Sequence, residues 1–295
     1  MLSQFSFDYF FWIVALGTMV LGFTSGLIGT SLVLEKQSQL GDAIGHAVYP
    51  GVIITFMLFQ TRNTAILLVG AVVFGLIAFS IIQLIRRYTD FPYESILALV
   101  LSAFFSLGLL LYNVVQRNPQ FQTVNFAGLN NYIMGQAAFL MWSDVRLIII
   151  VSVVVVAVFM LLYPKIKLYL FDSIFAQTIG INNQWISHLL LLMCLLVIAV
   201  GLQAVGAKLI SSMLVAPAIA AQQWTQSYGK MLGLAGVFGM VASFIGTLLS
   251  TTISNIATGP MIVVVLTAIA LLSLVFGTKG ILADKLYTSH KEVSR

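Results

Sequence analysis

Residues 145–163 read VRLIIIVSVVVVAVFMLLY, a long apolar run in which Arg146 is the single charge. A helix needs about 20 apolar residues to cross the roughly 30 Å of bilayer hydrocarbon. The run is nearly that long, and it lacks the two-residue alternation of a membrane barrel strand. It therefore predicts a membrane-spanning α-helix.

The whole chain has the same apolar character. Its 295 residues are 60% hydrophobic and 8% charged, with a mean hydropathy of +1.05. Soluble domains carry roughly 25% charged residues, so this chain cannot cover a water-facing surface. The lone Cys194 excludes a disulfide scaffold. The net charge of +5 is interpreted as loop charge, with no nucleic-acid partner, and membrane lipid is the expected surrounding.

Several further stretches are long and apolar enough to span a bilayer. With the first run they lie near residues 9–34, 64–85, 95–115, 145–163, 187–206, 231–253 and 260–277. Two stretches are weaker, because 40–59 contains Asp42 and His46, and 209–224 is short and contains Pro217. Counting both predicts an all-α polytopic membrane protein with nine transmembrane helices in a single domain over 1–295. Eight helices are the alternative.

The placement of Lys and Arg predicts the orientation. In the nine-helix arrangement ten of the 14 basic residues fall on one side, and Arg62, Arg117, Arg146 and Lys208 fall on the other. Cytoplasmic loops are enriched in basic residues. We therefore expect a multi-pass protein of the plasma membrane whose tail, 278–295, lies in the cytoplasm.

The most informative polar residues stand in the weak stretch 40–51, LGDAIGHAVYPG. Asp42 and His46 are four apart and share one helix face. An ionisable residue inside a membrane is a candidate functional site, and a carboxylate with an imidazole suits a divalent first-row metal. The residues alone leave three roles open: a cap or structural pair, a metal ligand pair, or a proton relay. Pro50 and Gly51 predict a kink beside the pair.

Two ligands from one chain leave a metal's coordination shell incomplete. A second copy of the chain, facing the first, would complete it with two carboxylates and two imidazoles. The spacing of Gly41 and Gly45 produces a small-residue face that lets another helix approach closely.

The chain has no phosphate-binding loop of its own. Gly229-Lys230 is followed by Met231, and Gly277-Thr278-Lys279 by Gly280, so neither matches the nucleotide-binding pattern. A cysteine cluster and a zinc-protease motif are also absent from the sequence. We therefore expect no enzyme activity on this chain, and the energy for any active transport must come from an ion gradient or another subunit.

Residues 165–186 predict a short amphipathic helix on the cytoplasmic side. Asp172 can cap a helix that begins at Ser173, and Gly180 suits its end. The hydrophobic face has helical spacing and consists of Phe171, Ile174, Phe175 and Ile179. Such a helix fits a docking groove, although a helix lying on the membrane has the same pattern.

Pro217 interrupts the stretch 209–224 and leaves backbone carbonyls without their helical hydrogen bonds. Inside a membrane such carbonyls are tolerated only where they contact protein or line a water-filled path. Candidate lining residues of such a path are Met213 and Pro217 itself, with Ser211, Ser212 and Gln222 beside them. Core packing is the more common role for a methionine such as Met213.

The stretch Gly41–Gly51, GDAIGHAVYPG, resembles the signature G-D-A-I/L-S-H-A-V-L-P-G of the manganese/zinc/iron permease family of ABC transporters. Gly45 replaces the usual serine, and Tyr49 replaces the usual leucine, where it could narrow a path. Three other segments resemble family segments in order: YIMGQAAFLMWSDV (132–145), LFDSIFAQTIGIN (170–182) and AVGAKLISSMLVAPAIAAQQW (204–224).

This resemblance implies the membrane-spanning half of a metal importer. Two permease copies, identical or paralogous, would pair above cytoplasmic ATPase chains, and an extracellular metal-binding lipoprotein would deliver the cation. Asp42 and His46 would then be the metal positions of the path, with no permanently bound cofactor. The resemblance assigns ATPase coupling to Phe171, Asp172, Phe175, Ala176 and Gly180. The GQAA stretch favours manganese as the transported metal, with zinc or iron next. The alternative function is a gradient-driven carrier in which Asp42 relays protons.

Overall fold

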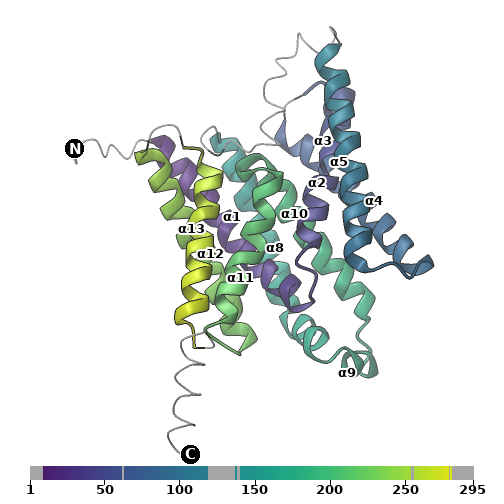
Figure 1. Ribbon diagram of the computed structural model, residues 1–295, viewed down its shortest axis with the longest axis vertical. Coiled ribbons are helices and arrows are strands. Elements are labelled where there is room, and N and C mark those ends of the chain that lie inside the picture. The colour runs from purple at the N-terminus through teal and green to yellow at the C-terminus, as the bar shows by residue number, and fades with distance from the viewer. Residues whose placement is uncertain are drawn as a thin grey trace, which may run out of the picture.

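A computed structural model describes residues 9–61, 63–118, 137, 140–253, 256–278 and 280. Its regular elements over these residues are helices, arranged side by side as a bundle (Figure 1). They are α1 (Tyr9–Leu34), α2 (Leu40–Ala47), α3 (Tyr49–Phe59), α4 (Thr64–Tyr88), α5 (Tyr93–Arg117), α8 (Trp142–Phe171), α9 (Ser173–Thr178), α10 (Asn183–Val205), α11 (Ala207–Gln222), α12 (Tyr228–Thr252) and α13 (Thr258–Phe276).

Eight segments of the described chain are long and apolar enough to cross a membrane. They are α1, α2 together with α3 (Leu40–Phe59), α4, α5, α8, α10, α12 and α13. The predicted all-α membrane fold is confirmed. The remaining apolar stretch, Leu209–Gln222 in α11, is too short to meet the same criterion. α11 packs inside the bundle against α1, α12 and α13, and the number of crossings is eight or nine according to whether this short helix is counted.

Two of the long helices, α4 and α10, begin at an asparagine whose side chain replaces a missing backbone partner. The side chain of Asn63 accepts a hydrogen bond from the Ala65 amide at 3.0 Å at the start of α4. Asn182 does the same for the amide of Trp185 in α10, at 3.2 Å. Such caps satisfy the amides that the first turn leaves open.

The most extensive contact between two helices of the bundle is that of α1 with α12. A Cβ atom on Gly22 would collide with the carbonyl oxygen of Gly239, so the two backbones touch. Hydroxyl pairs join the helices on either side of this contact: Thr18 with Thr247 at 3.2 Å, and Ser31 with Tyr228 at 2.9 Å. Small residues and hydroxyls of this kind are typical of helix contacts inside membranes.

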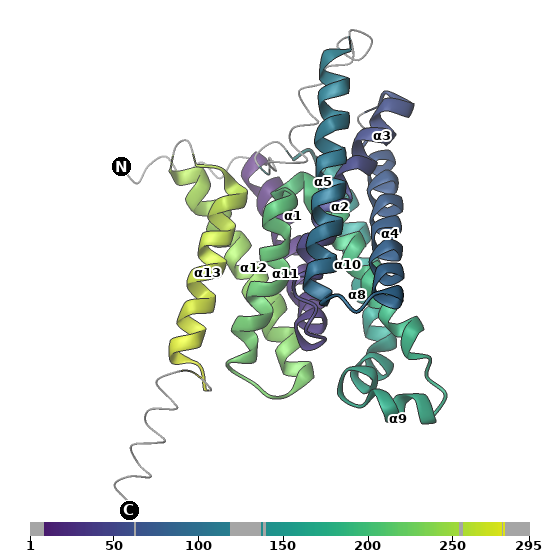
Figure 2. The same cartoon turned by 45° about the vertical axis from the view of Figure 1, so that its right-hand side comes forward.

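The weak stretch 40–59 is not one continuous helix. The helix is interrupted at Val48, and Pro50 lies in the first turn of α3. Proline has no N–H to donate to the carbonyl of His46, four residues earlier, so the interruption falls in the turn that Pro50 disrupts, where the sequence predicts a kink. Gly51 serves a different purpose, since a Cβ there would collide with the carbonyl of Gly70 on α4. Figure 2 shows α2 and α3 beside α4 and α5.

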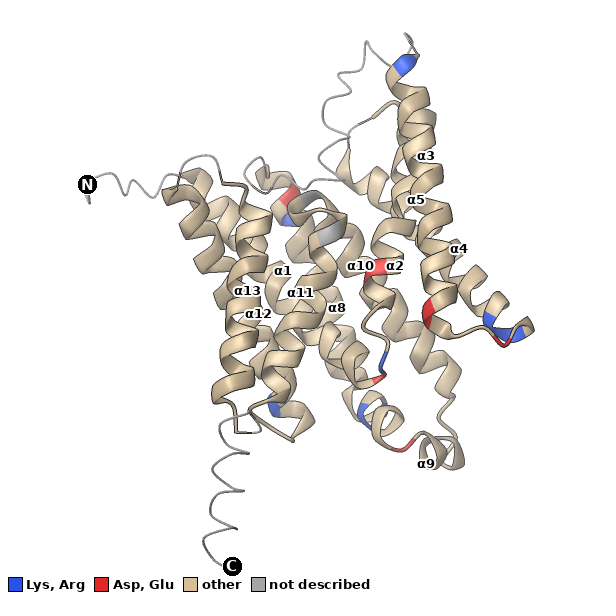
Figure 3. Cartoon of the chain, in the orientation of Figure 1, with Lys and Arg blue, Asp and Glu red and all other residues tan. Residues whose placement is uncertain are grey.

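Charged residues gather near the ends of the bundle, and the middle of most helices carries none (Figure 3). The short helix α2, which lies away from the ends of the bundle, carries Asp42 in its first turn. The short helix α9 lies at one end of the bundle in both ribbon views. Of the predicted tail 278–295, all but Thr278 and Gly280 lies outside the described residues.

A candidate metal path on α2

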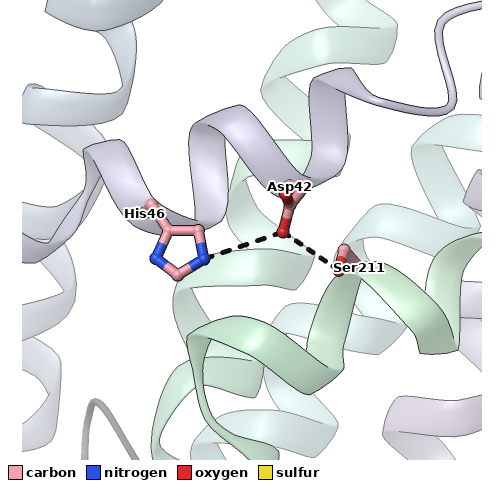
Figure 4. Close-up of polar contacts among 3 residues, drawn as sticks. All are labelled: Asp42, His46 and Ser211. Carbon is pink, nitrogen blue, oxygen red and sulfur yellow. Dashed lines mark hydrogen bonds and ion pairs between the residues drawn. The ribbon is translucent and has the colours of Figure 1, made fainter. Parts of the chain in front are cut away.

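Asp42 and His46 lie on one face of α2, one helical turn apart (Figure 4). Oδ1 of Asp42 is 3.7 Å from Nε2 of His46. The two side chains differ in exposure: that of Asp42 is 48% exposed and that of His46 is 10% exposed. A half-exposed carboxylate in the first turn of α2, with an imidazole one turn further along, can offer an oxygen and a nitrogen to one cation.

Asp42 also has a partner from another helix. The Ser211 hydroxyl of α11 donates to Oδ1 of Asp42 at 3.4 Å (Figure 4). Ser211 is one of the residues that the sequence suggests for a path, and the structure brings it to the pair. A long, weak bond of this kind orients the carboxylate and leaves its other oxygen for a ligand.

The close approach of α2 and α11 leaves little room for a side chain at Gly45. A Cβ atom on Gly45 would lie 3.2 Å from the carbonyl oxygen of Ala207, which is tight but not prohibitive. The small face formed by Gly41 and Gly45 therefore packs against α11, as its spacing predicts, and brings Ser211 within reach of Asp42.

Aromatic rings fill the opposite side of the imidazole. Phe105 on α5 meets the His46 ring edge to face, with ring centroids 4.9 Å apart. Tyr49 is 2% exposed and packs against Gly108 of α5. The suggestion that Tyr49 narrows a path is therefore wrong for this conformation, because the ring is enclosed between α3 and α5. Phe105 was missed because an apolar residue on an apolar helix gives no sequence signal.

Of the residues suggested for a path on α11, Ser211 and Ser212 are partly exposed and Gln222 is exposed, whereas Met213 and Pro217 are enclosed. Met213 is fully buried and Pro217 is buried. The single chain therefore uses both as packing residues, the more common role for a buried methionine.

One chain supplies an incomplete ligand set. Among the residues that the structure describes, no group of three or more His, Cys, Asp or Glu side chains lies close enough together to hold a metal ion. Transition metals bind through four or more ligands. The exposed side of Asp42 is where further ligands have to enter.

The predicted amphipathic helix is present as α9. It begins at Ser173, and the Asp172 side chain accepts the amide hydrogen of Phe175 at 2.9 Å. At its end Gly180 adopts a positive φ of 86°, and the Ile181 amide donates to the carbonyl of Ala176 at 2.9 Å. This is the glycine-terminated helix end that the sequence predicts.

The side chains in and beside α9 differ in their exposure to solvent. Ala176 is fully buried, whereas a set of large apolar side chains is exposed: Phe171, Ile174, Phe175 and Ile179. An apolar face this open at a helix end is characteristic of an interaction site.

Glu35, which the sequence analysis did not single out, lies in the connection between α1 and α2. Its Oε1 is buried and accepts no hydrogen bond from the residues that the structure describes. Burial raises the pKa of this carboxyl, and a hydrogen bond with Tyr169 opposes the shift in pKa. Tyr169 precedes α9 on the last turns of α8, so this contact joins the segment before Asp42 to the segment before α9. The signal in the sequence is an acid placed directly after the apolar run of α1.

Comparison with known proteins places this architecture in a family. Residues 7–277 match the ABC 3 transport family. The chain is 41% identical over 276 residues to the zinc transport system membrane protein TroC of Treponema pallidum, covering 93% of this chain and 92% of TroC. It is 36% identical to the manganese transport system membrane protein MntC of Bacillus subtilis, covering 93% of this chain and 62% of that protein.

A solved structure agrees with these sequences. The PsaBC structure from Streptococcus pneumoniae, in complex with Fab, superposes with a TM-score of 0.82 at 27% identity, covering 92% of this chain and 93% of the other. The match to the family extends from α1 to α13, and the prediction of a permease subunit of an ABC transporter is confirmed. The chain belongs to the ABC 3 transport family.

Proposed function

We propose that this permease imports a divalent transition metal across the plasma membrane, with manganese as the first candidate and zinc or iron as alternatives. The observation that carries the proposal is the half-exposed carboxylate of Asp42 beside the imidazole of His46 on a buried helix. Relatives named for zinc and for manganese support this range of cargo. The GQAA stretch supports manganese, although most of it lies outside the described residues.

Two copies of the chain are proposed to face each other across the exposed side of Asp42. A carboxylate open to hydrocarbon is costly, and a partner copy would remove that cost while adding a second carboxylate and imidazole. Release of the cation then requires only that the two halves separate, which is alternating access rather than a continuous pore.

The exposed face of α9 is proposed to dock on a cytoplasmic ATPase subunit. Its apolar side chains stand at the end of the bundle that carries the basic residues Arg86, Arg87, Lys165 and Lys167, the end that positive charge places in the cytoplasm. The contact of Glu35 with Tyr169 supplies a connection from this end to the segment before Asp42. An extracellular metal-binding lipoprotein would deliver the cation at the other end.

Uptake of labelled manganese, zinc and iron, measured in cells that lack this chain, tests the proposal. Asp42→Asn and His46→Ala should each reduce uptake to that of cells without the permease. Asp90→Asn is the matched control, because Asp90 is an exposed carboxylate between α4 and α5. Normal uptake with Asp42→Asn, at equal amounts of protein in the membrane, would remove the proposed role. Uptake that persists without the ATPase would favour the gradient-driven carrier.

Cross-linking tests the facing arrangement separately. The native Cys194 is fully buried and does not react in the folded chain. Asp42→Cys should therefore form a covalent dimer on mild oxidation in membranes, whereas Asp90→Cys should not. A reactive but purely monomeric Asp42→Cys variant would place Asp42 away from the partner copy.

Docking of α9 is tested with Ile174→Glu. Ile174 is 78% exposed, so the charge does not disturb the bundle. The ATPase should no longer co-purify with this variant. If the ATPase still co-purifies and only the attachment of α9 to lipid vesicles is lost, the alternative of a helix lying on the membrane is correct.

A further inference from the structure

A groove of about 570 Å³ runs between α4 and α10, apart from Asp42 and His46. Its apolar part is formed by Leu76 and Phe79 of α4 and Leu191 of α10. Its polar part is formed by Gln83 and Arg87 of α4 and His188 of α10. The volume lies within the range of pockets that hold small organic ligands.

The groove has the length of one membrane leaflet. Leu76, Ser80, Gln83 and Arg87 are three or four residues apart on α4, and they therefore lie along one face. The rise from Leu76 to Arg87 is about 16 Å at 1.5 Å per residue, close to half of the roughly 30 Å hydrocarbon thickness. The apolar end thus lies near the bilayer centre when Arg87 lies at the headgroups.

Aromatic residues mark the headgroup level at the same end. Tyr88, next to Arg87, is 74% exposed, and Trp185, one turn before His188, is 52% exposed. Exposed Tyr and Trp residues of this kind concentrate where a membrane meets water. Large exposed apolar side chains continue along α4 away from this level: Val69, Val73, Ile77 and Leu84. Of the residues that line the groove, Leu76 is 39% exposed and Leu84 is 57% exposed, so the groove is open at this apolar outer surface, whereas Phe79 and Leu191 lie deeper.

The charge at the polar end is positive and unbalanced. Among the residues that the structure describes, no Asp or Glu lines the groove. None of them forms an ion pair with Arg87 either. The His188 ring is held in place, because its Nδ1 donates to the Gln184 carbonyl at 2.5 Å and the ring meets Phe79 edge to face at 5.6 Å. With Nδ1 engaged, Nε2 is the ring nitrogen available to a ligand.

We propose that this groove binds an anionic phospholipid of the bilayer. The headgroup phosphate pairs with Arg87 and contacts His188, and one acyl chain lies against Leu76, Phe79 and Leu191. Basic pockets between transmembrane helices at the cytoplasmic side bind anionic headgroups in this way. Because the lipid contacts both helices, it stabilises the packing of α4 against α10, the helix that follows α9.

Native mass spectrometry of the assembled, full-length permease, with phosphatidylglycerol or phosphatidylcholine added, tests this assignment. Phosphatidylglycerol should bind more tightly, and Arg87→Gln should weaken its binding about fivefold, the effect of one basic residue near a membrane surface. Arg86→Gln is the matched control, since Arg86 lies over the Tyr93 ring at 5.1 Å instead of lining the groove. Equal weakening by both variants would reduce the effect to general surface charge and overturn the proposal.

Two further arms separate the lipid from other occupants. Ser80→Trp fills the groove from an exposed position and should displace the lipid whatever its headgroup; unchanged binding would place the lipid elsewhere. Glycerol phosphate without acyl chains should not compete at equal concentration, and effective competition would identify a free-anion site instead. Loss of a protein subunit, with lipid binding intact, in the Ser80→Trp variant would show that the groove holds a partner helix.

Discussion

The buried carboxylate of Asp144 offers a sharp test of how a structural acid differs from a functional one in this fold. Asp144 lies in the first turn of α8 and is 7% exposed. Its Oδ1 accepts the Thr64 hydroxyl hydrogen at 2.8 Å, and its Oδ2 accepts the Met141 amide hydrogen at 3.0 Å. One side chain thus caps α8 and ties it to the start of α4.

Asp144→Asn keeps the shape but removes the charge. The new amide nitrogen can only donate, so the Thr64 hydroxyl must turn from donor to acceptor, and both hydrogen bonds become neutral ones. A hydrogen bond to a charged group contributes about 1.5–3 kcal/mol and a neutral one about 0.5–1.5 kcal/mol. We expect the free energy of unfolding to fall by about 2 kcal/mol, which lowers the thermal midpoint in detergent by roughly 4–8 °C. Metal uptake per folded molecule should stay at the parent level, unlike that of Asp42→Asn.

A double-mutant cycle with Thr64→Val identifies the bond responsible. In the Thr64→Val background the Oδ1 bond is already absent, so Asp144→Asn should cost less than it does in the parent chain. If the cost is the same in both backgrounds, the Thr64 bond contributes nothing and the reasoning is wrong.

Two further predictions concern packing and pH. Gly51→Ala should lower the free energy of unfolding by about 1–3 kcal/mol, because the new Cβ meets the backbone of Gly70. Gly45→Ala should lower it less, since the nearest contact of a Cβ there is 3.2 Å away. Thermal midpoints that rank the two variants in the reverse order would contradict these helix contacts. Glu35→Gln should raise the midpoint at neutral pH. Burial lifts the pKa of Glu35 above its ordinary value of 4.5, so the parent chain loses stability as pH rises through the interval above 4.5, and the glutamine variant does not. The difference between the two midpoints, followed from pH 4 to pH 8, should grow with pH; a difference that is flat or of opposite sign would show that the charged carboxylate stabilises the fold.

Much of the fold could be predicted from hydropathy alone, because a helix in hydrocarbon must satisfy its own backbone. The predicted run 9–34 coincides with α1, and 64–85 lies within α4. The cap of Asp172 was also readable, since it depends on neighbours in sequence. The break at Val48 follows from Pro50, which cannot donate a hydrogen bond to the carbonyl four residues earlier.

The site was harder to predict, because its parts come from separate helices. The pairing of Asp42 with His46 follows from helical spacing, but the contact of Ser211 spans 169 residues of sequence. The burial of Glu35 and the bond from Thr64 to Asp144 depend in the same way on how helices meet. Sequence shows which side chains carry chemistry, whereas tertiary packing decides which of them lie together.

The stoichiometry of manganese bound to the purified permease, measured by equilibrium dialysis, tests the central claim most directly. If Asp42 and His46 of two facing copies hold the passing cation, one tightly bound ion should be found for every two chains, and Asp42→Asn or His46→Ala should abolish it. One ion per chain, or tight binding that survives both substitutions, would contradict the account.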